Sequence, residues 1–385
     1  MDNATNHPKI AVIGGGPGGL ILARVLKVNG LQCTVFELDA QAASRAQGGT
    51  LDMHPESGQM ALKAAQVWEE FQKFARYEAD TMKLLDKTGK VYLENVSFSD
   101  NNDHPEIDRL QLRNLLLDSL DESTIQWNQK VQKIIKKDGY FVVVTAEGES
   151  GPFDIVVGAD GAWSKVRAFL STTTPEYTDL TFGDAFIPNI ETRYPDIATL
   201  VGGGTMAARE SGISIFSQLL GDGSVRSYFI LSTKDRDLSS LKSANSEEIR
   251  QYLLQEYADW DPSLKKIIEV SEGVILRPLY VLPTGYRWKS QPNITLIGDA
   301  AHLISFFGGQ GANLAMQDGA ELALAIATAV HNDHDVHKSI QGYEEQMWKR
   351  AEMASKFSNL GIQNSFASNP AQLMMERFKG KLHQK

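Results

Sequence analysis

The sequence of 385 residues has almost no cysteine, since Cys33 is the only one. A single thiol cannot form an intramolecular disulfide, and Cys33 lies in a strand-like run, so we interpret it as a small buried side chain. Nothing therefore indicates an oxidising compartment. Positive charge is also scarce: 38 Lys and Arg stand against 48 Asp and Glu, for a net charge of −10. This balance argues against nucleic acid as a partner, because Lys and Arg make most contacts with phosphate backbones.

Long apolar runs are missing as well. Residues 1–9 are polar and lack the apolar stretch of a secretion signal, and no later segment approaches the run of about 20 apolar residues that crosses a bilayer. We expect a monomer in the cytoplasm, with neither a membrane nor a metal among its partners. A chain of this length exceeds what one hydrophobic core usually organises, so two domains are expected.

The first 37 residues have the pattern of a βαβ unit. Residues 10–13 are a short apolar run that stops at a glycine cluster, as a buried parallel strand does. Apolar residues then recur at helical spacing over residues 17–29, and Gly30 follows as a stop signal. Residues 32–37 are strand-like again. The pattern predicts an α/β fold with a Rossmann-like nucleotide-binding domain.

The chain changes character between residues 171 and 274. Strand-like runs at 213–216 and 227–231 are separated by glycine-rich turns, and a helix is expected at 246–260. We interpret this region as an inserted, mostly antiparallel sheet domain.

The nucleotide fold then resumes. Residues 153–157 and 294–297 are expected as buried strands, and residues 314–330 and 339–361 as helices. The second of these helices is long enough to bridge two domains. The polar tail after residue 369 carries no clear pattern.

Three glycines, Gly14, Gly16 and Gly19, stand between the first strand and the first helix. Without side chains, the backbone can approach a pyrophosphate closely, and the helix N-terminus attracts its negative charge. Glu37, at the end of the second strand, can accept hydrogen bonds from ribose hydroxyls. Strand, helix and acidic residue all stand where dinucleotide binding requires them. FAD and NAD share this geometry, so the unit does not choose between them.

Three further segments distinguish between FAD and NAD. The segment 298–302 (GDAAH) follows the last buried strand and precedes 308–313 (GGQGAN), while 160–167 (DGAWSKVR) lies in the middle of the chain. In this order the segments resemble the fingerprints of the group A aromatic flavin hydroxylases, the para-hydroxybenzoate hydroxylase family. The resemblance implies FAD, a GR2-type Rossmann-like FAD-binding domain, an inserted antiparallel-sheet substrate domain and a long C-terminal bridging helix. We expect the FAD-binding domain at 1–74, 97–170 and 275–335, the substrate-binding domain at 75–96 and 171–274, and the bridging helix and tail at 336–385.

Within that family the sequence is most similar to the tetracycline-inactivating TetX type, along segments 48–54, 104–109, 259–261 and 298–313. This resemblance implies that Asp299 holds a ribityl hydroxyl of FAD, that Arg109 and Asp52 contact FAD, and that Arg45 helps to receive NADPH. The TetX type has an Arg where Leu38 stands, so one adenosine contact is missing. The expected cofactor residues are Gly14, Gly16, Gly19, Glu37, Arg45, Asp52, Arg109, Asp160, Asp299, Gly309, Gly311 and Asn313.

The residues by themselves leave alternatives open at two of these positions. Asp299 could equally be an N-cap for the next turn, and Arg109 could be a solvated charge on a helix. His302, at a strand-to-helix junction, is interpreted as structural.

The loop 308–313 also suggests a mechanism. Its N–H groups and the positive helix end can stabilise negative charge on a reduced flavin. Such a flavin reacts with dioxygen to a C4a-hydroperoxide, which transfers oxygen to an electron-rich carbon such as that of a phenolate or enolate. No second strand, glycine loop and helix unit is visible in the sequence, so NADPH or NADH is expected to bind transiently near the flavin. Because the flavin carries the chemistry, no side chain is assigned as catalytic; Gly309 and Gly311 support the flavin.

Aromatic residues of the inserted domain and of the loop facing it are candidates for a substrate pocket. They are Phe182, Phe186, Met206, Phe216, Tyr228, Phe306 and Phe307. The residues assigned to the substrate are Phe216, Arg226, Tyr228, Phe306, Phe307 and Gly308.

The polar contacts of the TetX type are changed. That type holds the polar ring of tetracycline with a Gln, an Arg and a His, where this sequence has Ala185 or Asp184, Gly204, and Arg226 or a neighbour. Its Pro-Pro pair after GDAAH is replaced by Ser305-Phe306. The resemblance implies a polycyclic phenol or enol as substrate, either a tetracycline-type antibiotic or another aromatic polyketide.

Rival activities share the same cofactor. A flavin halogenase is set aside, because none of the six tryptophans is followed by another two residues later. A non-catalytic flavin redox sensor and an FAD oxidase or dehydrogenase stay as alternatives. Consumption of NADPH that rises with a phenol excludes the sensor, and incorporation of ¹⁸O from ¹⁸O₂ excludes the oxidase.

Overall fold

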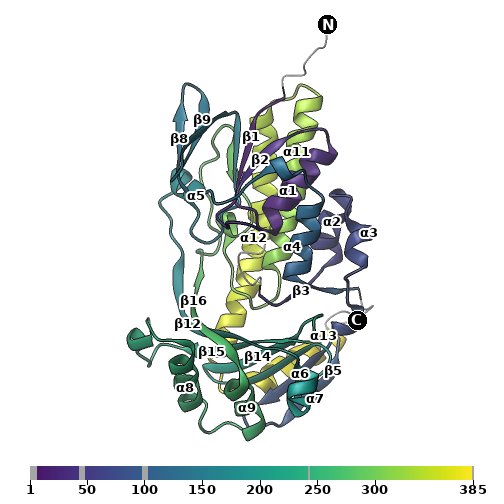
Figure 1. Ribbon diagram of the computed structural model, residues 1–385, viewed down its shortest axis with the longest axis vertical. Coiled ribbons are helices and arrows are strands. Elements are labelled where there is room, and N and C mark those ends of the chain that lie inside the picture. Colours follow the sequence, from purple (N-terminus) through teal and green to yellow (C-terminus); the bar gives the residue numbers. More distant parts are fainter. Residues whose placement is uncertain (1–6, 43–47, 98–102, 242, 384–385) are drawn as a thin grey trace.

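The computed structural model describes residues 7–42, 48–97, 103–241 and 243–383. A five-stranded sheet with helices packed beside it forms the upper part in Figure 1, and a seven-stranded sheet forms the lower part. The predicted α/β fold class is confirmed. The division into domains at the predicted boundaries stays a prediction, and strand β16 (Glu272–Val281) runs across the boundary at residue 275.

The upper sheet is parallel throughout its strand pairs. Its central strands are apolar and buried on both faces, as expected of a parallel sheet covered by helices. In sheet order the strands are β17 (Ile294–Leu296), β11 (Ile155–Gly158), β1 (Ile10–Ile13), β2 (Cys33–Phe36) and β7 (Ile125–Gln126).

Two helices from opposite ends of the chain lie side by side next to this sheet (Figure 1). They are α1 (Pro17–Val28), close to its predicted bounds, and α11 (Gly311–His331), which starts earlier than predicted. Their backbones approach so closely that a Cβ on Gly319 would lie 2.3 Å from the carbonyl oxygen of Gly18. Glycines therefore let the first turn of α1 pack against the backbone of α11.

The strand predicted at residues 153–157 is wrong in its bounds. Residue 153 ends β10 (Gly148–Phe153) of a three-stranded sheet, and β11 begins at Ile155. The break falls at Asp154, whose carboxylate accepts a 2.7 Å hydrogen bond from the backbone N–H of Lys9. The two other strands of the small sheet are β8 (Val131–Lys137) and β9 (Tyr140–Thr145).

The seven-stranded sheet is antiparallel except for the parallel pair β13 and β4. In sheet order its strands are β16, β12 (Glu176–Ile187), β15 (Val225–Ser232), β14 (Ile213–Leu219), β13 (Thr205–Glu210), β4 (Met82–Asp86) and β5 (Val91–Val96). One face packs against α6 (Ile190–Arg193), α7 (Pro195–Val201), α8 (Ser246–Glu256) and α9 (Pro262–Val270).

The helix predicted at residues 246–260 is shorter than expected, because α8 ends at Glu256. Tyr257 is fully buried, and its hydroxyl donates to the carbonyls of Ser214 and Ile230. These hydrogen bonds hold the chain after α8 against the sheet. Asp261 then caps α9 by accepting from the N–H of Ser263.

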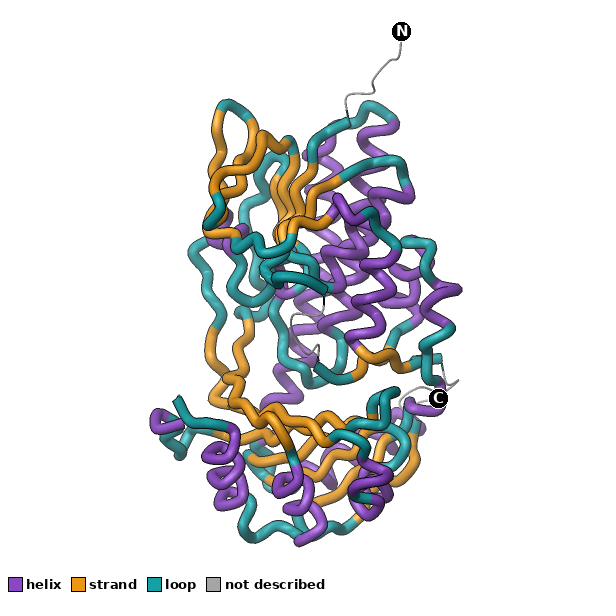
Figure 2. Tube along the Cα trace, in the orientation of Figure 1, coloured by secondary structure: helices purple, strands orange, loops and turns teal. Residues whose placement is uncertain are grey.

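Two C-terminal helices complete the lower part. The long helix α12 (Val336–Ser365) runs from the upper part to the lower part (Figures 1 and 2), which fits the predicted bridging helix. The polar tail forms a helix that the sequence did not predict, α13 (Pro370–His383). Its Met374, Met375 and Phe378 pack against the sheet beside Leu84 and Ala207, so tertiary contacts and not local pattern create it.

The remaining elements are short. They are β3 (Thr50–Asp52), β6 (Glu106–Asp108), α2 (Met60–Ala64), α3 (Trp68–Gln72), α4 (Arg109–Asp118), α5 (Lys165–Leu170), α10 (Asp299–His302), a π-helical segment Pro55–Gln59, and 3-10 turns at Tyr77–Ala79, Glu122–Thr124 and Ser239–Leu241. None of the helices within the described ranges has the length and apolar character needed to traverse a bilayer.

Candidate cofactor and substrate site

The glycine loop after β1 is tight on one side and open on the other. Gly14 has a φ of +107°, and a Cβ there would lie 2.3 Å from the carbonyl oxygen of Ala159. A Cβ on Gly19 would lie 2.1 Å from the carbonyl oxygen of Gly14. At Gly16, by contrast, no described heavy atom lies within 4 Å of the Cβ position. The open side at Gly16 is where a diphosphate could approach the backbone.

Glu37, which directly follows β2, holds this loop in place by hydrogen bonds. Its buried carboxylate accepts from the N–H of Gly15 at 2.6 Å and from the N–H of Asp39 at 3.0 Å. The guanidinium of Arg113, on α4, lies 3.9 Å from the same carboxylate. The sequence did not single out Arg113, which resembles any other polar residue of an amphipathic helix.

A second helix N-terminus offers free donors. Helix α11 begins after the N-cap Gln310, and no side chain of the described residues caps it. A Cβ on Gly311 would meet no described atom within 4 Å. The first N–H groups of a helix have no partner within the helix, so those of α11 are available to an anionic ligand.

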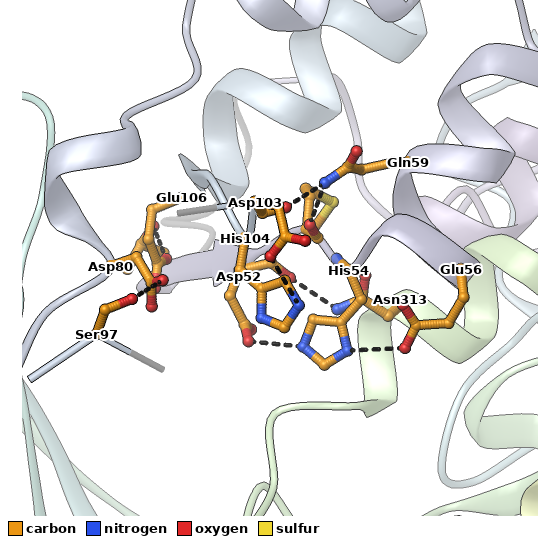
Figure 3. Close-up of polar contacts among 12 residues, drawn as sticks. Asp52, His54, Glu56, Gln59, Asp80, Ser97, Asp103, His104, Glu106 and Asn313 are labelled. Carbon is orange, nitrogen blue, oxygen red and sulfur yellow. Dashed lines mark hydrogen bonds and ion pairs between the residues drawn. The ribbon is translucent and has the colours of Figure 1, made fainter. Parts of the chain in front are cut away.

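Asn313 joins this N-terminus to β3. Its amide donates to the carbonyl of Asp52 at 2.7 Å and accepts from the N–H of His54 at 3.0 Å. Gly309 lies over the same strand end, because a Cβ there would be 3.2 Å from the carboxylate of Asp52. The structure thus brings together three of the predicted cofactor residues, Asp52, Gly309 and Asn313. Figure 3 shows Asp52 and Asn313.

The central DG motif is connected to Asp299 by Arg167. Asp160 accepts from the hydroxyl of Ser164 at 2.5 Å and from the N–H of Lys165 at 2.6 Å, so its carboxylate shapes the turn before α5. Arg167 donates to the carbonyl of Ala162 and, at 3.0 Å, to that of Ala300. The sequence named this motif but missed the role of Arg167 in joining it to the end of β17.

Arg109 lies between the two predicted sites. Its backbone N–H donates to the carbonyl of Gly49 at 3.1 Å, and its side chain passes along Gly48. Its positive charge acts on both the carboxylate of Asp299 and the phenol of Tyr228. Arg45, the predicted NADPH contact, lies outside the described residues.

His302 points into the interior instead of toward these residues. Its imidazole lies 2.5 Å from the carboxylate of Asp318 on α11, and both side chains are buried. Asp318 also accepts from the N–H of Gly298 at 3.0 Å and from Arg350 of α12 at 3.0 Å. This network fixes the backbone that leads into Asp299.

Three of the predicted substrate residues lie on strands β14 and β15 of the large sheet. Phe216 stands directly opposite Tyr228, and Gln218 stands opposite Arg226 in the same ladder. Cross-strand pairs share a face of the sheet. The sequence missed Gln218, although its alternation with Phe216 could have placed it on this face.

The face that carries these residues meets the loop before α11. The ring of Phe182 lies 5.8 Å from that of Tyr228 and 5.4 Å from that of Phe306, and the Phe306 and Phe307 rings lie 4.7 Å apart. Gly308, which is predicted to meet the substrate, packs tightly on α12, where a Cβ would be 2.7 Å from the ring of Phe357. Aromatic rings from sheet and loop therefore form one cluster.

Two of the apolar pocket candidates lie elsewhere. Side chains alternate between the two faces of a strand, and that of Met206 points to the opposite face of the sheet. There it belongs to the core under α6 to α9. The ring of Phe186 lies at the edge of the sheet against Gly273. Neither is part of the cluster around Phe182.

Charges border the aromatic cluster. Asp184 lies 2.6 Å from Arg226 and accepts from Arg277 at 2.9 Å, and both Asp184 and Arg226 are buried. Burial also raises the pKa of the Tyr228 phenol above its ordinary value. In β6, burial and the neighbouring Asp52 raise the pKa of Glu106 to about 8.

Comparison with known proteins identifies the family. Residues 8–358 match the family described as FAD binding domain. This chain belongs to that family.

The enzyme is thus an FAD-dependent monooxygenase of the group that the sequence motifs resemble, with reduced nicotinamide cofactor and dioxygen as co-substrates. It is 31% identical to Monooxygenase penA of Penicillium thymicola, over 96% of this chain and 98% of that protein. It is 29% identical to Monooxygenase asqM of Emericella nidulans, over 82% and 83% of the two chains.

Solved structures share the fold. HpxO of Klebsiella pneumoniae, complexed with FAD and uric acid, has a TM-score of 0.80 and 19% identity, with 100% of this chain and 95% of that chain covered. The tetracycline destructase Tet(51) has a TM-score of 0.73 and 21% identity, with 97% of each chain covered.

The residues present fit FAD, since Gly16 and Gly311 leave open backbone at two uncapped helix N-termini. FAD supplies the redox chemistry when bound, and this chain positions it.

Proposed function

We propose that this monooxygenase hydroxylates a flat, multi-ring phenol or enol bound between the sheet β12, β15 and β14 and the loop before α11. The observation that carries the proposal is the 5.4 Å contact between the rings of Phe182 and Phe306, which joins that sheet to that loop. Aromatic rings favour stacked or edge-to-face contact with other rings, so such a cluster suits a planar substrate.

The polar groups beside the cluster suit phenol or enol oxygens. The phenol of Tyr228 keeps its proton at neutral pH, since its ordinary pKa of 10.0 is already well above neutral and burial raises it further, so its hydroxyl can donate to an anionic substrate oxygen. The side-chain oxygen of Gln218 and the Tyr228 hydroxyl both lie within 3.0 Å of the Cβ position of Gly49. Because Gly49 has no side chain, these two polar groups pack directly against its backbone and lie together between β3 and the large sheet.

We propose the following residues for cofactor binding, each in the role given above. The glycine loop and Glu37 hold the adenosine diphosphate end, and Asp299 with Arg109 holds the ribityl chain. The flavin lies near Asp52 and the N-terminus of α11. The set is Gly14, Gly16, Gly19, Glu37, Arg45, Asp52, Arg109, Asp160, Asp299, Gly309, Gly311 and Asn313.

The substrate is better described as an aromatic polyketide or polyphenol than as tetracycline. Asp184 forms ion pairs with Arg226 and Arg277, so charged groups stand where the TetX resemblance implies an uncharged Gln and a His. Gly204 has no side chain to offer, and a Cβ there would lie 2.4 Å from the carbonyl of Thr81. Tetracycline-type antibiotics, whose inactivation would confer resistance, are the second candidate, since Arg109 and Asp52 lie in the segments most similar to that type.

The test is mass spectrometry of a phenol and enol library, tetracyclines included, after incubation with enzyme, NADPH or NADH, and ¹⁸O₂. A product that carries one ¹⁸O atom and a phenol-dependent rise in NADPH oxidation support the proposal. Oxidation without label would identify an oxidase and refute it.

A paired substitution locates the binding site. Phe306→Ala should raise the KM for the substrate about tenfold, since aromatic contacts contribute about 1 kcal/mol or more each. Phe74→Ala is the matched control, because the two rings are 41% and 44% exposed and neither replacement empties a core. Equal KM values for the two variants would place the substrate elsewhere.

A further inference from the structure

Two histidines meet at the ends of β3 and β6. In this antiparallel pair Asp52 stands opposite Glu106, and the N–H of Met53 donates to the carbonyl of Pro105 at 3.0 Å. The pairing thus continues past the strand ends and brings His54 beside His104 (Figure 3). Asp52 is two residues before His54, so alternation puts both side chains on the same side.

The three side chains converge. The rings of His54 and His104 are stacked, with centroids 4.5 Å apart, and the Nε2 of His54 lies 2.8 Å from the carboxylate of Asp52. One possible ligand atom from each residue lies within 4.8 Å of the other two. Among the described residues this is the one such group of at least three His, Cys, Asp or Glu side chains.

The convergent groups are held in place and can be reached from solvent. The backbone of His54 is fixed by its N–H, which donates to the side chain of Asn313. The side chains of His54 and Asp52 are 12% and 27% exposed, and that of His104 is 22% exposed. A surface pocket of about 330 Å³ opens beside His54 and Glu56.

Further carboxylates surround the pair of imidazoles. Glu56 lies 3.9 Å from the Nδ1 of His54, and Asp103 lies 3.8 Å from the Nε2 of His104. Carboxylates next to ligating histidines orient the rings and raise their basicity in metal sites. The negative charge around the two rings also attracts a cation.

We propose that Asp52, His54 and His104 bind a divalent transition-metal ion such as Zn²⁺ or Co²⁺. Imidazole nitrogen with one carboxylate suits these ions, whereas Ca²⁺ and Mg²⁺ prefer oxygen ligands throughout. Because the carboxylate of Asp52 also lies beside Gly309, a bound ion changes the charge next to the loop that opens α11. Metal loading should therefore change the rate of NADPH oxidation.

The experiment uses the FAD-loaded enzyme, freed of metal with a chelator and then given Zn²⁺ or Co²⁺ alone. Wild type should bind one ion per chain by calorimetry and metal analysis, with a visible Co²⁺ spectrum typical of nitrogen and oxygen ligands. His104→Ala should bind at least about tenfold more weakly. Its FAD content and metal-free NADPH oxidation should equal those of wild type, because His104 is outside the proposed FAD and substrate sets.

His331→Ala is the control variant. His331 and His7 form another contact between imidazoles, with centroids 6.4 Å apart, and could collect metal nonspecifically. This variant should bind like wild type, and His54→Ala should behave like His104→Ala. Wild-type binding no stronger than that of His104→Ala, or binding lost in His331→Ala instead, would overturn the proposal. Neither result bears on FAD binding or hydroxylation, which the ¹⁸O₂ experiment tests separately.

Discussion

The side-chain amide of Asn313 donates a 2.7 Å hydrogen bond to the backbone carbonyl of Asp52 and so ties the start of α11 to the end of β3. The same side chain accepts from the N–H of His54, and it is almost wholly buried. One residue therefore sets the spacing between two chain segments that we propose to surround the flavin.

Replacement of Asn313 by Asp should loosen this spacing. A carboxylate can still accept from His54, but it cannot donate to the carbonyl of Asp52, which then loses its partner. Loss of a buried hydrogen bond costs about 1–3 kcal/mol, seen as weaker FAD binding in a fluorescence titration and lower stability in urea. Asn332→Asp is the control, since Asn332 makes a similar 2.8 Å bond to a carbonyl at the exposed end of α11. Unchanged FAD affinity in Asn313→Asp would contradict the assigned role.

The glycine loop allows a test that separates binding from folding. Gly16 has a φ of −78° and open space around its Cβ position, so Gly16→Ala should fold normally yet bind FAD at least about tenfold more weakly, because the methyl group occupies the diphosphate path. Gly14→Ala should instead lower the free energy of unfolding by about 1–3 kcal/mol, since it combines a positive φ with a steric clash. Urea denaturation without FAD and FAD titration measure the two effects. The same loss of stability in both variants would show that the loop is only structural.

Asp299→Ala should lose bound FAD and activity together. The carboxylate follows the last strand of the parallel sheet, where the positive charges of Arg109 and Arg167 act on it, and we propose that it accepts from the ribityl chain. The ratio of flavin absorbance to protein absorbance after gel filtration measures occupancy. Asp118→Ala, an exposed carboxylate on α4, controls for loss of negative charge. Full flavin content and turnover in Asp299→Ala would exclude this role.

The buried pair of His302 and Asp318 should make stability depend on pH. Burial by itself lowers the pKa of His302, but Asp318 outweighs it, so that pKa lies above the ordinary 6.5. Burial by itself raises the pKa of Asp318, but His302 and Arg350 outweigh it, so that pKa lies below the ordinary 3.8. The stabilisation from His302 is complete below pH 6.5 and is lost as pH rises through its raised pKa. The stabilisation from Asp318 is complete above pH 3.8 and is lost as pH falls through its lowered pKa.

Asp318→Asn should therefore destabilise the protein most between pH 3.8 and 6.5, where both groups of the pair are charged in wild type. Removal of one partner of a buried ion pair costs about 3–5 kcal/mol. Urea denaturation at several pH values checks the effect, with Asp118→Asn as the control. A difference between variant and wild type that stays constant up to alkaline pH would show that His302 is not charged in the folded protein.

Local sequence pattern was enough to predict an element where the segment and its neighbours share one periodicity. The strand at Ile10–Ile13, the glycine loop after it and helix α1 were predicted almost to the residue, because consecutive residues carry all the signals. Local pattern did not predict α13 or the end of α8. Met374 on α13 and Tyr257 just after α8 are positioned by their contacts with the large sheet. No window of sequence contains those partners.

The sequence by itself determined that this protein binds a dinucleotide, because that binding depends on glycines and a carboxylate that stand in fixed order along a strand, a turn and a helix. Only the tertiary structure decided which side chains meet between distant segments. It set Phe182 against Phe306, neutralised Arg226 with Asp184, and paired His54 with His104 across β3 and β6. These contacts join residues far apart in the chain, and their geometry follows from strand register and helix packing, which no local pattern encodes.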